Sequence, residues 1–447
     1  MRRSLLALAV ATAAVAASVT VAVSPARAAA GFTVSGGRLL DANGTSFVLR
    51  GISHPHAWYA TQTRAFADIK ATGANTVRVV LSGGRWTTNT AADVADVISR
   101  CRQNRLICVL ENHDTTGYGE QSGAVTLDAA ADYWVGLRSV LVGQEPYVII
   151  NVGNEPVGNN AVTPNWTTAT SAAIAKLRAA GLHHTLMVDA PNWGQDWQFQ
   201  MRDNAATVFA ADPDRNTVFS IHMYGVFDTA AEITDYLGRV RAAGLPIVVG
   251  EFGFNHSDGD PDEGTIMAYA QANGIGWMAW SWSGNGGGVE YLDMVTAFDP
   301  TRRTSWGTRV IDGPDGIRAT SREATVYGGT GPSPTPTPTV SPTPSPTPAP
   351  AGCTATFRLV GQWQGGFQGE VTVTAGGAAI TSWTVTWTLA SGQTVSSSWS
   401  TALTVSGARV TARNVDYNGR LGAGARTTFG FLGGGPTSSP VLTCAAS

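Results

Sequence analysis

Two glutamates stand out in this sequence because each one comes directly after an apolar, strand-like segment. Glu155 follows the segment Tyr147–Val152, and Glu251 follows the segment Pro246–Gly250. A carboxylate is rarely buried in a protein unless it has a partner or a chemical role. If both strands end at one rim, the two carboxylates supply the minimum set of groups for hydrolysis of a glycosidic bond.

The surroundings of the two glutamates predict different roles for them. Retaining hydrolysis needs one carboxylic acid that stays protonated near neutral pH and one carboxylate that stays ionised. Glu155 lies in an apolar stretch that would raise its pKa, so we expect it to be the general acid/base. Glu251 is expected to be the ionised nucleophile, because a cation and a phenol would lie beside it; the expected neighbours are Arg78, His222 and Tyr224. A helix N-cap or a structural ion pair is the alternative for either glutamate.

The elements that must position these side chains alternate between strand-like and helix-like segments. The predicted strands are Phe47–Gly51, Thr76–Leu81, Leu106–Glu111, Tyr147–Val152, Thr185–Asp189, Thr217–His222, Pro246–Gly250 and Gly276–Trp282. The predicted helices include Thr61–Ala71, Ala91–Asn104, Leu127–Val142, Asn165–Ala180, Thr229–Ala243 and Asp262–Asn273. This alternation predicts an α/β fold, a (β/α)8 TIM barrel. The alternative, a doubly wound sheet, would usually show a glycine-rich phosphate turn after its first strand, which this sequence lacks.

In such a barrel the chemistry lies at the C-terminal ends of the strands. Almost every predicted strand delivers polar or aromatic side chains to that end. These residues are His54, His56, Arg78, Glu111, Asn112, His113, Asp114, Asn154, Glu155, Asp189, His222, Tyr224, Glu251, Trp280 and Trp282. We interpret His54 and His56 as cleft or structural groups and not as metal ligands, because no third ligand lies nearby in the sequence.

Composition limits the classes of partner. A formal net charge of −3, with Lys and Arg scattered along 447 residues, gives no electrostatic case for nucleic acid or an anionic membrane. The length favours two domains. The 14 tryptophans, against only 14% charged residues, are typical of proteins that stack aromatic rings on sugars. Core packing is the alternative explanation for about half of these tryptophans.

The N-terminus is predicted to be a signal peptide, residues 1–28. Arg2 and Arg3 precede an apolar run from Leu5 to about Val23, and Ala26-Arg27-Ala28 forms an A-x-A cleavage site. Cleavage after Ala30 is the second choice, and a membrane anchor is the alternative to export. No later segment has 18 continuous apolar residues. We therefore expect a secreted, extracellular protein.

A Pro/Ser/Thr-rich segment, 329–350, is predicted to be an extended polyproline linker. It separates a catalytic domain, 31–328, from a C-terminal domain, 351–447. The C-terminal domain shows period-two alternation divided by glycine-rich turns, for example in Val371–Thr374 and Trp383–Trp387. That pattern predicts an all-β sandwich, with Trp383 and Trp387 in its core.

Four cysteines in an exported chain favour disulfide bonds. Cys353 and Cys444 bracket the C-terminal domain, and a bond that closes so long a loop would add about 4 kcal/mol in the chain-entropy model. Cys101 and Cys108 flank a helix-to-strand turn and are a second candidate pair. Two buried free thiols are the alternative for that pair.

The segment after Glu251 carries closely spaced acidic residues, which suit a structural calcium ion. The candidate ligands are Asp258, Asp260, Asp262 and Glu263. Asp262 and Glu263 could equally cap the helix that follows, and the two interpretations stay open.

The strand-end residues resemble the signatures of glycoside hydrolase family 5, a family of retaining glycosidases. The resemblance rests on Asn154-Glu155-Pro156 and Glu251-Phe252-Gly253 and covers essentially all of residues 31–310. GISHPHAWY, RLICVLENHDTTGYGE, VDAPNWGQDW, SIHMYGV and AWSWSGNGGGVEYLDMV are similar to the bacterial endo-β-1,4-mannanases of that family. Ser53 and Asn112 depart from the mannanase pattern, in which Asn and an aliphatic residue are usual.

The resemblance implies a role for each residue of the set. Glu155 would be the acid/base and Glu251 the nucleophile. Arg78 and Asn154 would orient them, and Asn154 would also reach the substrate 2-hydroxyl. Trp280 or Trp282 would form the floor of the −1 subsite. The substrate-binding residues implied in this way are Arg78, His113, Asn154, His222, Tyr224, Trp280, Trp282 and Trp58.

The C-terminal domain resembles a family 2 carbohydrate-binding module over its whole length. The terminal cysteines, Gln362-Trp363, Ser398-Trp399 and Gly430-Phe431 carry this resemblance. Such modules hold crystalline cellulose or chitin on a strip of exposed aromatic rings. The implied strip is Trp363, Trp399 and Tyr417.

Taken together, the two resemblances imply a secreted, retaining endo-β-1,4-mannanase that is tethered to insoluble polysaccharide. Its substrates would be mannan, glucomannan and galactomannan. An endo-β-1,4-glucanase would share every catalytic residue, and a non-catalytic polysaccharide-binding protein is the alternative from another class. We expect a monomer that needs no cofactor for catalysis and that binds neither nucleic acid nor membrane.

Overall fold

The computed structural model describes residues 31–328, 352–363, 365–415, 418–422, 425–437 and 440–447. It divides the chain into two compact units, Met1–Thr337 and Pro338–Ser447. The segments predicted as a signal peptide (1–28) and as a linker (329–350) lie outside the described residues. None of the helices in the described ranges has the length and hydropathy that a bilayer span requires.

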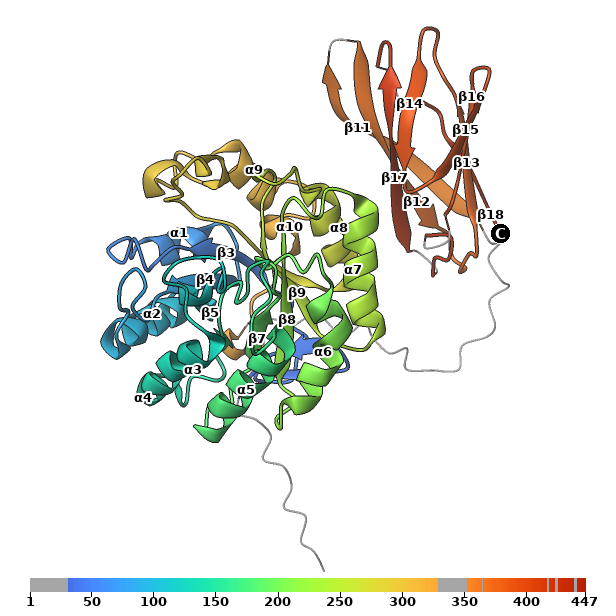
Figure 1. Cartoon of the computed structure of the whole chain (residues 1–447). Helices are drawn as coiled ribbons and strands as arrows, with labels where there is room; N and C mark the ends of the chain where they lie inside the picture. The colour runs from blue at the N-terminus through green and yellow to red at the C-terminus, as the bar shows by residue number, and fades with distance from the viewer. Residues whose placement is uncertain (1–30, 329–351, 364, 416–417, 423–424, 438–439) are drawn as a thin grey trace, which may run out of the picture. The chain divides into compact units, whose positions relative to one another are not determined.

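Eight parallel strands of the first unit form a closed barrel in the order β10-β3-β4-β5-β6-β7-β8-β9 (Figure 1). The strands are β3 (Arg50–His54), β4 (Thr76–Leu81), β5 (Ile107–Asn112), β6 (Val148–Asn151), β7 (Leu186–Asp189), β8 (Thr217–Met223), β9 (Ile247–Phe252) and β10 (Gly276–Ala279). The (β/α)8 barrel predicted from the alternating pattern is therefore confirmed.

Helices connect successive strands and surround the barrel (Figure 1). They are α1 (Ala65–Ala71), α2 (Ala91–Gln103), α3 (Leu127–Gly136), α4 (Arg138–Leu141), α5 (Trp166–Ala179), α6 (Gln200–Ala211), α7 (Ala230–Ala242), α8 (Glu263–Asn273), α9 (Ser305–Asp312) and α10 (Ile317–Thr320). Side-chain caps set several of the starts. Thr229 and Glu232 form a capping box at α7, and Asp262 caps α8.

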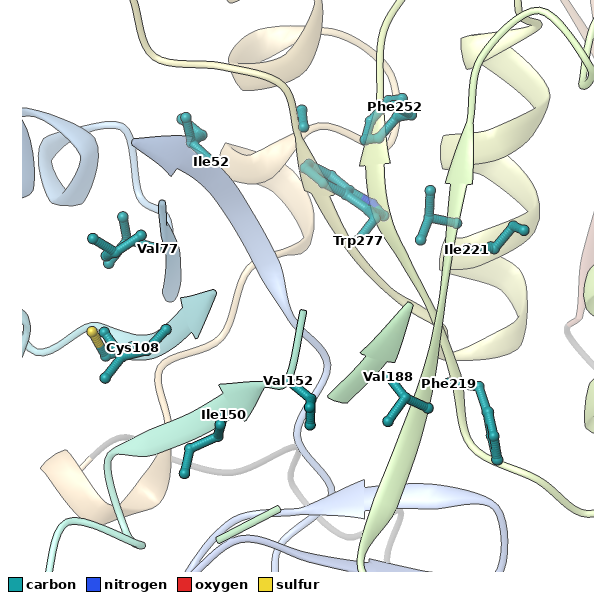
Figure 2. Packing of buried hydrophobic residues seen from close by; sticks show 14 of the residues in the cluster. Ile52, Val77, Cys108, Ile150, Val152, Val188, Phe219, Ile221, Phe252 and Trp277 are labelled. Atoms are coloured by element: carbon teal, nitrogen blue, oxygen red, sulfur yellow. The ribbon is translucent and has the colours of Figure 1, made fainter. Parts of the chain in front are cut away.

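The barrel strands are buried on both faces, and the two faces serve different cores. On β5, Cys108 and Leu110 point outward and pack under the helices, while Ile107 and Val109 belong to the core inside the barrel. The same alternation holds on β6, β7, β8, β9 and β10. Figure 2 shows the outward core, in which Ile150 on β6, Val188 on β7 and Phe219 on β8 stand on successive strands. This two-sided burial explains the nearly continuous apolar runs in the sequence.

The inward positions change from apolar to polar toward the C-terminal ends of the strands. On β5 the inward series runs from Ile107 through Val109 to Glu111, because side chains two residues apart share one face. On β6 and β7 the corresponding polar residues are Asn151 and Asp189, and all three polar residues are at most 1 % exposed. The interior of the barrel thus has a buried polar layer at the C-terminal ends of the strands and an apolar core toward their N-terminal ends.

The first barrel strand begins later than predicted. The sequence pattern predicted a strand over Phe47–Gly51, whereas β3 covers Arg50–His54. The residues before it pair instead with the N-terminal hairpin of β1 (Thr33–Ser35) and β2 (Arg38–Leu40), since the Phe47 N–H donates to the Leu39 carbonyl. A β-rich stretch alone does not reveal which neighbour it will pair with.

The C-terminal unit consists of two four-stranded antiparallel sheets, β11-β12-β17-β14 and β15-β16-β13-β18. The strands are β11 (Cys353–Trp363), β12 (Gly366–Ala375), β13 (Trp383–Thr388), β14 (Thr394–Trp399), β15 (Ala402–Ser406), β16 (Arg409–Arg413), β17 (Arg426–Gly434) and β18 (Thr443–Ala446). Trp383 and Trp387 are buried against Phe429, as predicted for a β-sandwich core.

The cysteines form one of the two expected bonds. A disulfide joins Cys353 to Cys444, 91 residues further along the chain. Cys101 and Cys108 are free thiols, so the expected bond between them is absent and the alternative of two buried thiols holds. Both side chains are fully buried in the outward core, where they pack as small apolar groups between α2 and β5. Burial and the hydrogen bond to Cys108 raise the pKa of the Cys101 thiol well above its ordinary value.

The disulfide predicts a stability effect that is confined to the C-terminal unit. Replacing Cys353 and Cys444 with Ala should cost that unit about 4 kcal/mol, because the unfolded chain loses a long covalent loop. Differential scanning calorimetry of the full chain should show a lower Tm for this unit and an unchanged Tm for the barrel. Equal Tm values for variant and wild-type C-terminal units would contradict the expectation.

Candidate active site

The two glutamates that were predicted to act together lie at the same end of the barrel. Glu155 follows β6 in a left-handed backbone conformation with φ of 40°, and Glu251 is the second-last residue of β9. One carboxylate oxygen of each glutamate and a ring nitrogen of His222 all lie within 4.8 Å of one another. Carboxyl groups lie about 5–5.5 Å apart in retaining glycosidases and about 6.5–9.5 Å apart in inverting ones, so this short spacing favours retention.

A glycine allows Glu251 to reach the interior. The register between β8 and β9 shifts after Ile221, so that His222 pairs with Glu251. A Cβ atom at Gly250 would lie only 2.0 Å from the Ser220 hydroxyl oxygen. Only glycine therefore permits the close approach of the two strands that brings Glu251 beside His222.

Arg78 on β4 is the centre of the polar layer and is completely buried. Its Nη1 donates to Glu251 Oε1 at 2.5 Å, and its Nη2 donates to Asn154 Oδ1 at 2.7 Å. Its Nε donates to Asn151 Oδ1 at 3.1 Å. Burial alone would lower the pKa of this guanidinium, but the carboxylates around it, Glu251 first, hold the pKa above its usual range. Arg78 is therefore a fixed cation that orients a carboxylate and an amide.

His222 on β8 lies between carboxylates from three other strands. Its Nδ1 is 2.9 Å from Glu155 Oε1 and 3.8 Å from Glu251 Oε2, and its Nε2 is 3.3 Å from Asp189 Oδ2. Burial alone would lower the pKa of this imidazole, but Glu251 and Asp189 raise it to about 10. The ring is therefore an imidazolium at neutral pH, and both of its nitrogens carry protons.

The environments of the two glutamates differ. Burial, together with the negative charge of Glu251, raises the pKa of Glu155 even though His222 opposes this effect. Glu251 has two donors of its own, because the Tyr224 hydroxyl donates to its Oε2 at 3.0 Å and Arg78 holds its other oxygen. Donors to a carboxylate favour the ionised form. The geometry thus gives one carboxyl group suited to donate a proton and one suited to attack.

Glu111 and His113 extend the polar layer along β5. His113 Nδ1 lies 2.8 Å from Glu111 Oε1, and Glu111 is fully buried 4.0 Å from Arg78. Burial alone would lower the pKa of His113, but Glu111 raises it above its ordinary value. His113 also stacks at 6.1 Å on Trp280, so it connects the charged layer to an aromatic surface.

The aromatic residues predicted to bind substrate have different positions. Trp280 is partly exposed and is held by a hydrogen bond from its Nε1 to Asn285 Oδ1. Trp58 is 40 % exposed and packs edge-on against His113. Trp282 is only 1 % exposed and lies within the outward core. The alternative that assigned the subsite floor to Trp282 is therefore wrong, because this ring has no free face.

Sequence reasoning missed several residues that border the glutamates. Trp86 is 41 % exposed and contacts both Trp58 and His113. A cleft of ≈ 570 Å³ also opens beside Glu155. Its lining includes Asn159, Asn192, Trp193, Gln195, Trp197 and His256. The sequence did contain a pattern that could have indicated this cleft. Residues 192–197, in the loop after β7, read Asn-Trp-Gly-Gln-Asp-Trp, and aromatic and amide side chains in a βα loop of a barrel can bind a sugar.

Three of the four acidic residues considered as calcium ligands have described protein partners of their own. Asp262 caps α8 by accepting from the Thr265 N–H and hydroxyl, and Glu263 pairs with Arg309. Asp258 accepts from Gln195 and from the Gly225 N–H. Among the described residues, the His, Cys, Asp and Glu set with donor atoms close enough to share an ion is Glu155, His222 and Glu251. The helix-capping interpretation is therefore the one the geometry supports for Asp262.

His54 and His56 are structural groups and do not line the cleft. Both are at most 1 % exposed, and His56 pairs with Asp93 at 3.1 Å. His54 packs edge-on against Phe66. Burial, with a smaller effect of His56, lowers the pKa of His54 to about 3. His54 is therefore neutral near neutral pH.

The predicted aromatic strip of the C-terminal unit is described in part. Trp399 on β14 is 40 % exposed, and its indole lies against Gly430 of the neighbouring strand β17. A Cβ atom at Gly430 would come within 2.2 Å of that ring. Tyr417 and the side chain of Trp363 lie outside the described residues.

Comparisons with known proteins match both parts of the chain. Residues 40–286 match the cellulase family, glycosyl hydrolase family 5. The chain belongs to this family. Residues 353–446 match the cellulose binding domain family.

Members of this family with the same barrel have been described as mannanases. The chain is 63% identical over 308 residues to mannan endo-1,4-beta-mannosidase of Streptomyces lividans, covering 68% of this chain and 80% of that protein. It is 51% identical over 308 residues to the enzyme of the same name from Cellvibrio japonicus, covering 68% and 71%. The mannohexaose complex of Thermomonospora fusca beta-mannanase is 62% identical with a TM-score of 0.65, covering 67% of this chain and 99% of that one.

The raised pKa of Glu155 predicts that Glu155→Gln changes stability in a pH-dependent way. A carboxyl group whose folded-state pKa lies above its ordinary value of 4.5 destabilises the fold as pH rises through that folded-state pKa. Gln cannot ionise, so the variant should unfold near the wild-type Tm at pH 4 and at a higher Tm at pH 8. The gain should be about 2–4 °C for each kcal/mol of penalty that is removed.

Thermal unfolding followed by circular dichroism at both pH values measures this difference. Glu145→Gln is the matched control, because Glu145 precedes β6 at the opposite end of the barrel. The control should lack the rise in Tm at pH 8 that is expected of Glu155→Gln. A Glu155→Gln Tm below that of the wild type at pH 8 would contradict the expectation.

Proposed function

We propose that this chain is a secreted endo-β-1,4-mannanase that cleaves internal mannosidic bonds with retention of configuration. The observation that carries the proposal is the pair of carboxyl groups of Glu155 and Glu251, whose oxygens lie within 4.8 Å of each other above the barrel. Their unequal environments supply the protonated and ionised partners that a double displacement needs. Family membership and the mannanases to which the barrel is 51–63% identical support the substrate class.

The proposed reaction has two steps. Glu251 attacks the anomeric carbon while Glu155 gives its proton to the glycosidic oxygen, so that the C–O bond breaks and the leaving chain departs with a hydroxyl group. Glu155, now ionised, takes a proton from water, and the resulting hydroxide breaks the ester bond between the sugar and Glu251. Both carboxyl groups then return to their starting states, and no cofactor is consumed.

The neighbouring residues act on these two groups. Arg78 and Tyr224 hold the Glu251 oxygens in place for attack. Asn154 is fixed by Arg78 and by Thr116, to which its Nδ2 donates at 2.8 Å. We assign to Asn154 a hydrogen bond with the 2-hydroxyl of the sugar, and to Trp280 the floor beneath that sugar.

The Glu155 and Glu251 roles predict different products from alanine variants supplied with azide. Glu155→Ala should lose about 10²–10⁴-fold in kcat on polysaccharide, because no acid protonates the leaving oxygen. On an activated aryl β-mannoside oligomer it should recover with azide and give the β-azide. Glu251→Ala should lose at least as much and give the α-azide, because azide then attacks from the face that the carboxylate occupied.

Nuclear magnetic resonance of the azide products distinguishes the two anomers. Glu145→Ala is the control and should keep wild-type activity, since it lies at the far end of the barrel. Near wild-type turnover by either glutamate variant, or the reverse assignment of anomers, would overturn the proposed mechanism.

Substrate class needs its own experiment, because an endo-β-1,4-glucanase would use the same residues. Initial rates on mannan, glucomannan, galactomannan, carboxymethyl-cellulose and xylan should be highest on the mannan-type polymers. A higher rate on carboxymethyl-cellulose would move the proposal to a glucanase. Absence of activity on all five would favour the binding-protein alternative.

We further propose that residues 351–447 hold the enzyme on an insoluble β-1,4-linked polysaccharide. The match of residues 353–446 to a cellulose binding domain and the exposed Trp399 support this role. Trp363 and Tyr417 are the other proposed members of the strip. Export after Ala28, a linker at 329–350 and a monomeric state complete the proposal, which N-terminal sequencing of the secreted protein and light scattering would test.

We expect Trp399→Ala to weaken binding to insoluble polysaccharide without changing catalysis. The variant should bind cellulose about tenfold more weakly, equivalent to about 1.4 kcal/mol, because it loses a stacking surface. It should hydrolyse soluble mannan at the wild-type rate. Depletion assays with crystalline cellulose and with chitin measure the loss, and Trp383→Phe, which alters the core, is the control for folding. Undiminished adsorption to both polymers would show that Trp399 is not part of the strip.

A further inference from the structure

Asp189 is a buried carboxylate that the proposed reaction does not use. It ends β7 and is 1 % exposed. Its Oδ2 lies 3.3 Å from His222 Nε2 and 3.4 Å from Arg78 Nη2. Asp189 therefore lies next to both cations of the polar layer, and no described contact joins it to Glu155 or Glu251.

Asp189 is held rigidly in this position. Its Oδ1 accepts from Asn151 Nδ2 at 2.9 Å, and its backbone carbonyl accepts from Trp166 Nε1 at 2.9 Å. Because the main chain and a neighbouring amide hold this carboxylate in place, it can hold the His222 ring in one orientation.

We propose that Asp189 is a positioning residue for the general acid/base: it keeps the His222 ring doubly protonated, so that Nδ1 always donates a hydrogen bond to Glu155. The inference rests on the acid/base role proposed for Glu155. Asp189 itself touches neither substrate nor reacting atoms.

The charges around His222 support this arrangement. The ring faces Glu155 after β6, Asp189 on β7 and Glu251 on β9, and Arg78 on β4 is the nearby cation. Tyr224, directly after β8, donates its hydroxyl to Glu251. Burial alone would lower the pKa of His222, and Glu251 and Asp189 raise it to about 10. Asp189 is the one of these carboxylates that does not change its charge or bonding in the reaction cycle.

The protonation of His222 determines the direction in which the Glu155 carboxyl group donates its proton. A neutral His222 could present a lone pair at Nδ1, which would accept the Glu155 proton and turn it away from the glycosidic oxygen. An imidazolium can only donate, so the Glu155 hydroxyl stays available for the leaving group. When Glu155 becomes ionised in the first step, the same imidazolium stabilises the new carboxylate.

Asp189→Asn tests the proposal in the full chain with two readouts. The first is the titration of His222 by nuclear magnetic resonance of ¹⁵N-labelled histidine, with the resonance assigned by its loss in His222→Gln. In the wild type His222 should stay protonated through pH 8, and in Asp189→Asn it should lose its proton at lower pH. The second readout is the pH–rate profile on mannohexaose. The kcat of Asp189→Asn should fall at least tenfold at pH 8 with KM within twofold of wild type.

Two further variants make the result specific. Asp189→Glu restores the charge and should recover part of kcat at pH 8 and the wild-type titration direction. Asp212→Asn is the matched control, because Asp212 is a buried aspartate paired with Arg178 that the proposed mechanism does not use. It should lower stability and leave both the His222 titration and the shape of the pH–rate profile unchanged.

The titration separates failure of this inference from failure of the proposed function. An unchanged His222 titration in Asp189→Asn would overturn the role of Asp189, even if the glutamate variants behave as expected. If Asp189→Asn does not fold, the His222 titration of the wild type still tests the proposal. A His222 ring that is neutral at pH 7 in the wild type would overturn the role of Asp189. If the glutamate variants keep their activity, the acid/base role proposed for Glu155 is wrong. A shifted His222 titration in Asp189→Asn would even then show that Asp189 and His222 form an ion pair.

Discussion

The buried ion pair between Arg78 and Glu251 is the interaction on which the rest of the site depends. Neither charge could be taken out of water without the other, and removal of one would leave the other buried and unpaired. Around this pair, the side chains of Glu111 and Asp189 lie beside those of Arg78, His222 and His113. Glu155 is the fourth carboxyl group of this layer, and burial together with the charge of Glu251 raises its pKa.

The barrel supplies this layer through simple strand geometry. Side chains two residues apart share one face, so an inward apolar series such as Ile107 and Val109 continues into Glu111 without any change in backbone conformation. Parallel strands then bring the polar ends of such series together at one rim. Gly250 is the exception that completes the layer, because only a residue without Cβ allows β9 to approach Ser220 and place Glu251 beside His222.

The same geometry explains how much of the site could be predicted from sequence. The positions of Glu155 and Glu251 follow from strand ends, which periodicity reveals even where boundaries are wrong by several residues, as at β3. Arg78 lies within β4, on the inward face that strand alternation assigns to it. The ion pair of His222 with Asp189 was not predicted, since strand alternation places both side chains inside the barrel but does not show which of them meet. Trp280 and Trp282 could not be distinguished either, because residues one and three positions after the end of a strand have left the alternation that assigns faces. Asp262 was ambiguous because helix caps and calcium ligands draw on the same side chains.

Reaction type and substrate range are carried by different parts of the first unit. The charged layer consists almost wholly of strand residues whose hydrogen bonds leave them little freedom. The exposed rings that border it, Trp58, Trp86 and Trp197, lie on connecting segments, and such segments tolerate change far better than a buried ion pair does. Substitutions in the loops can therefore change which polysaccharide lies in the cleft without disturbing the proposed double displacement. This separation is the physical reason why the glutamate pair alone predicts glycoside hydrolysis, while the assignment of mannan depends on the residues that surround the pair.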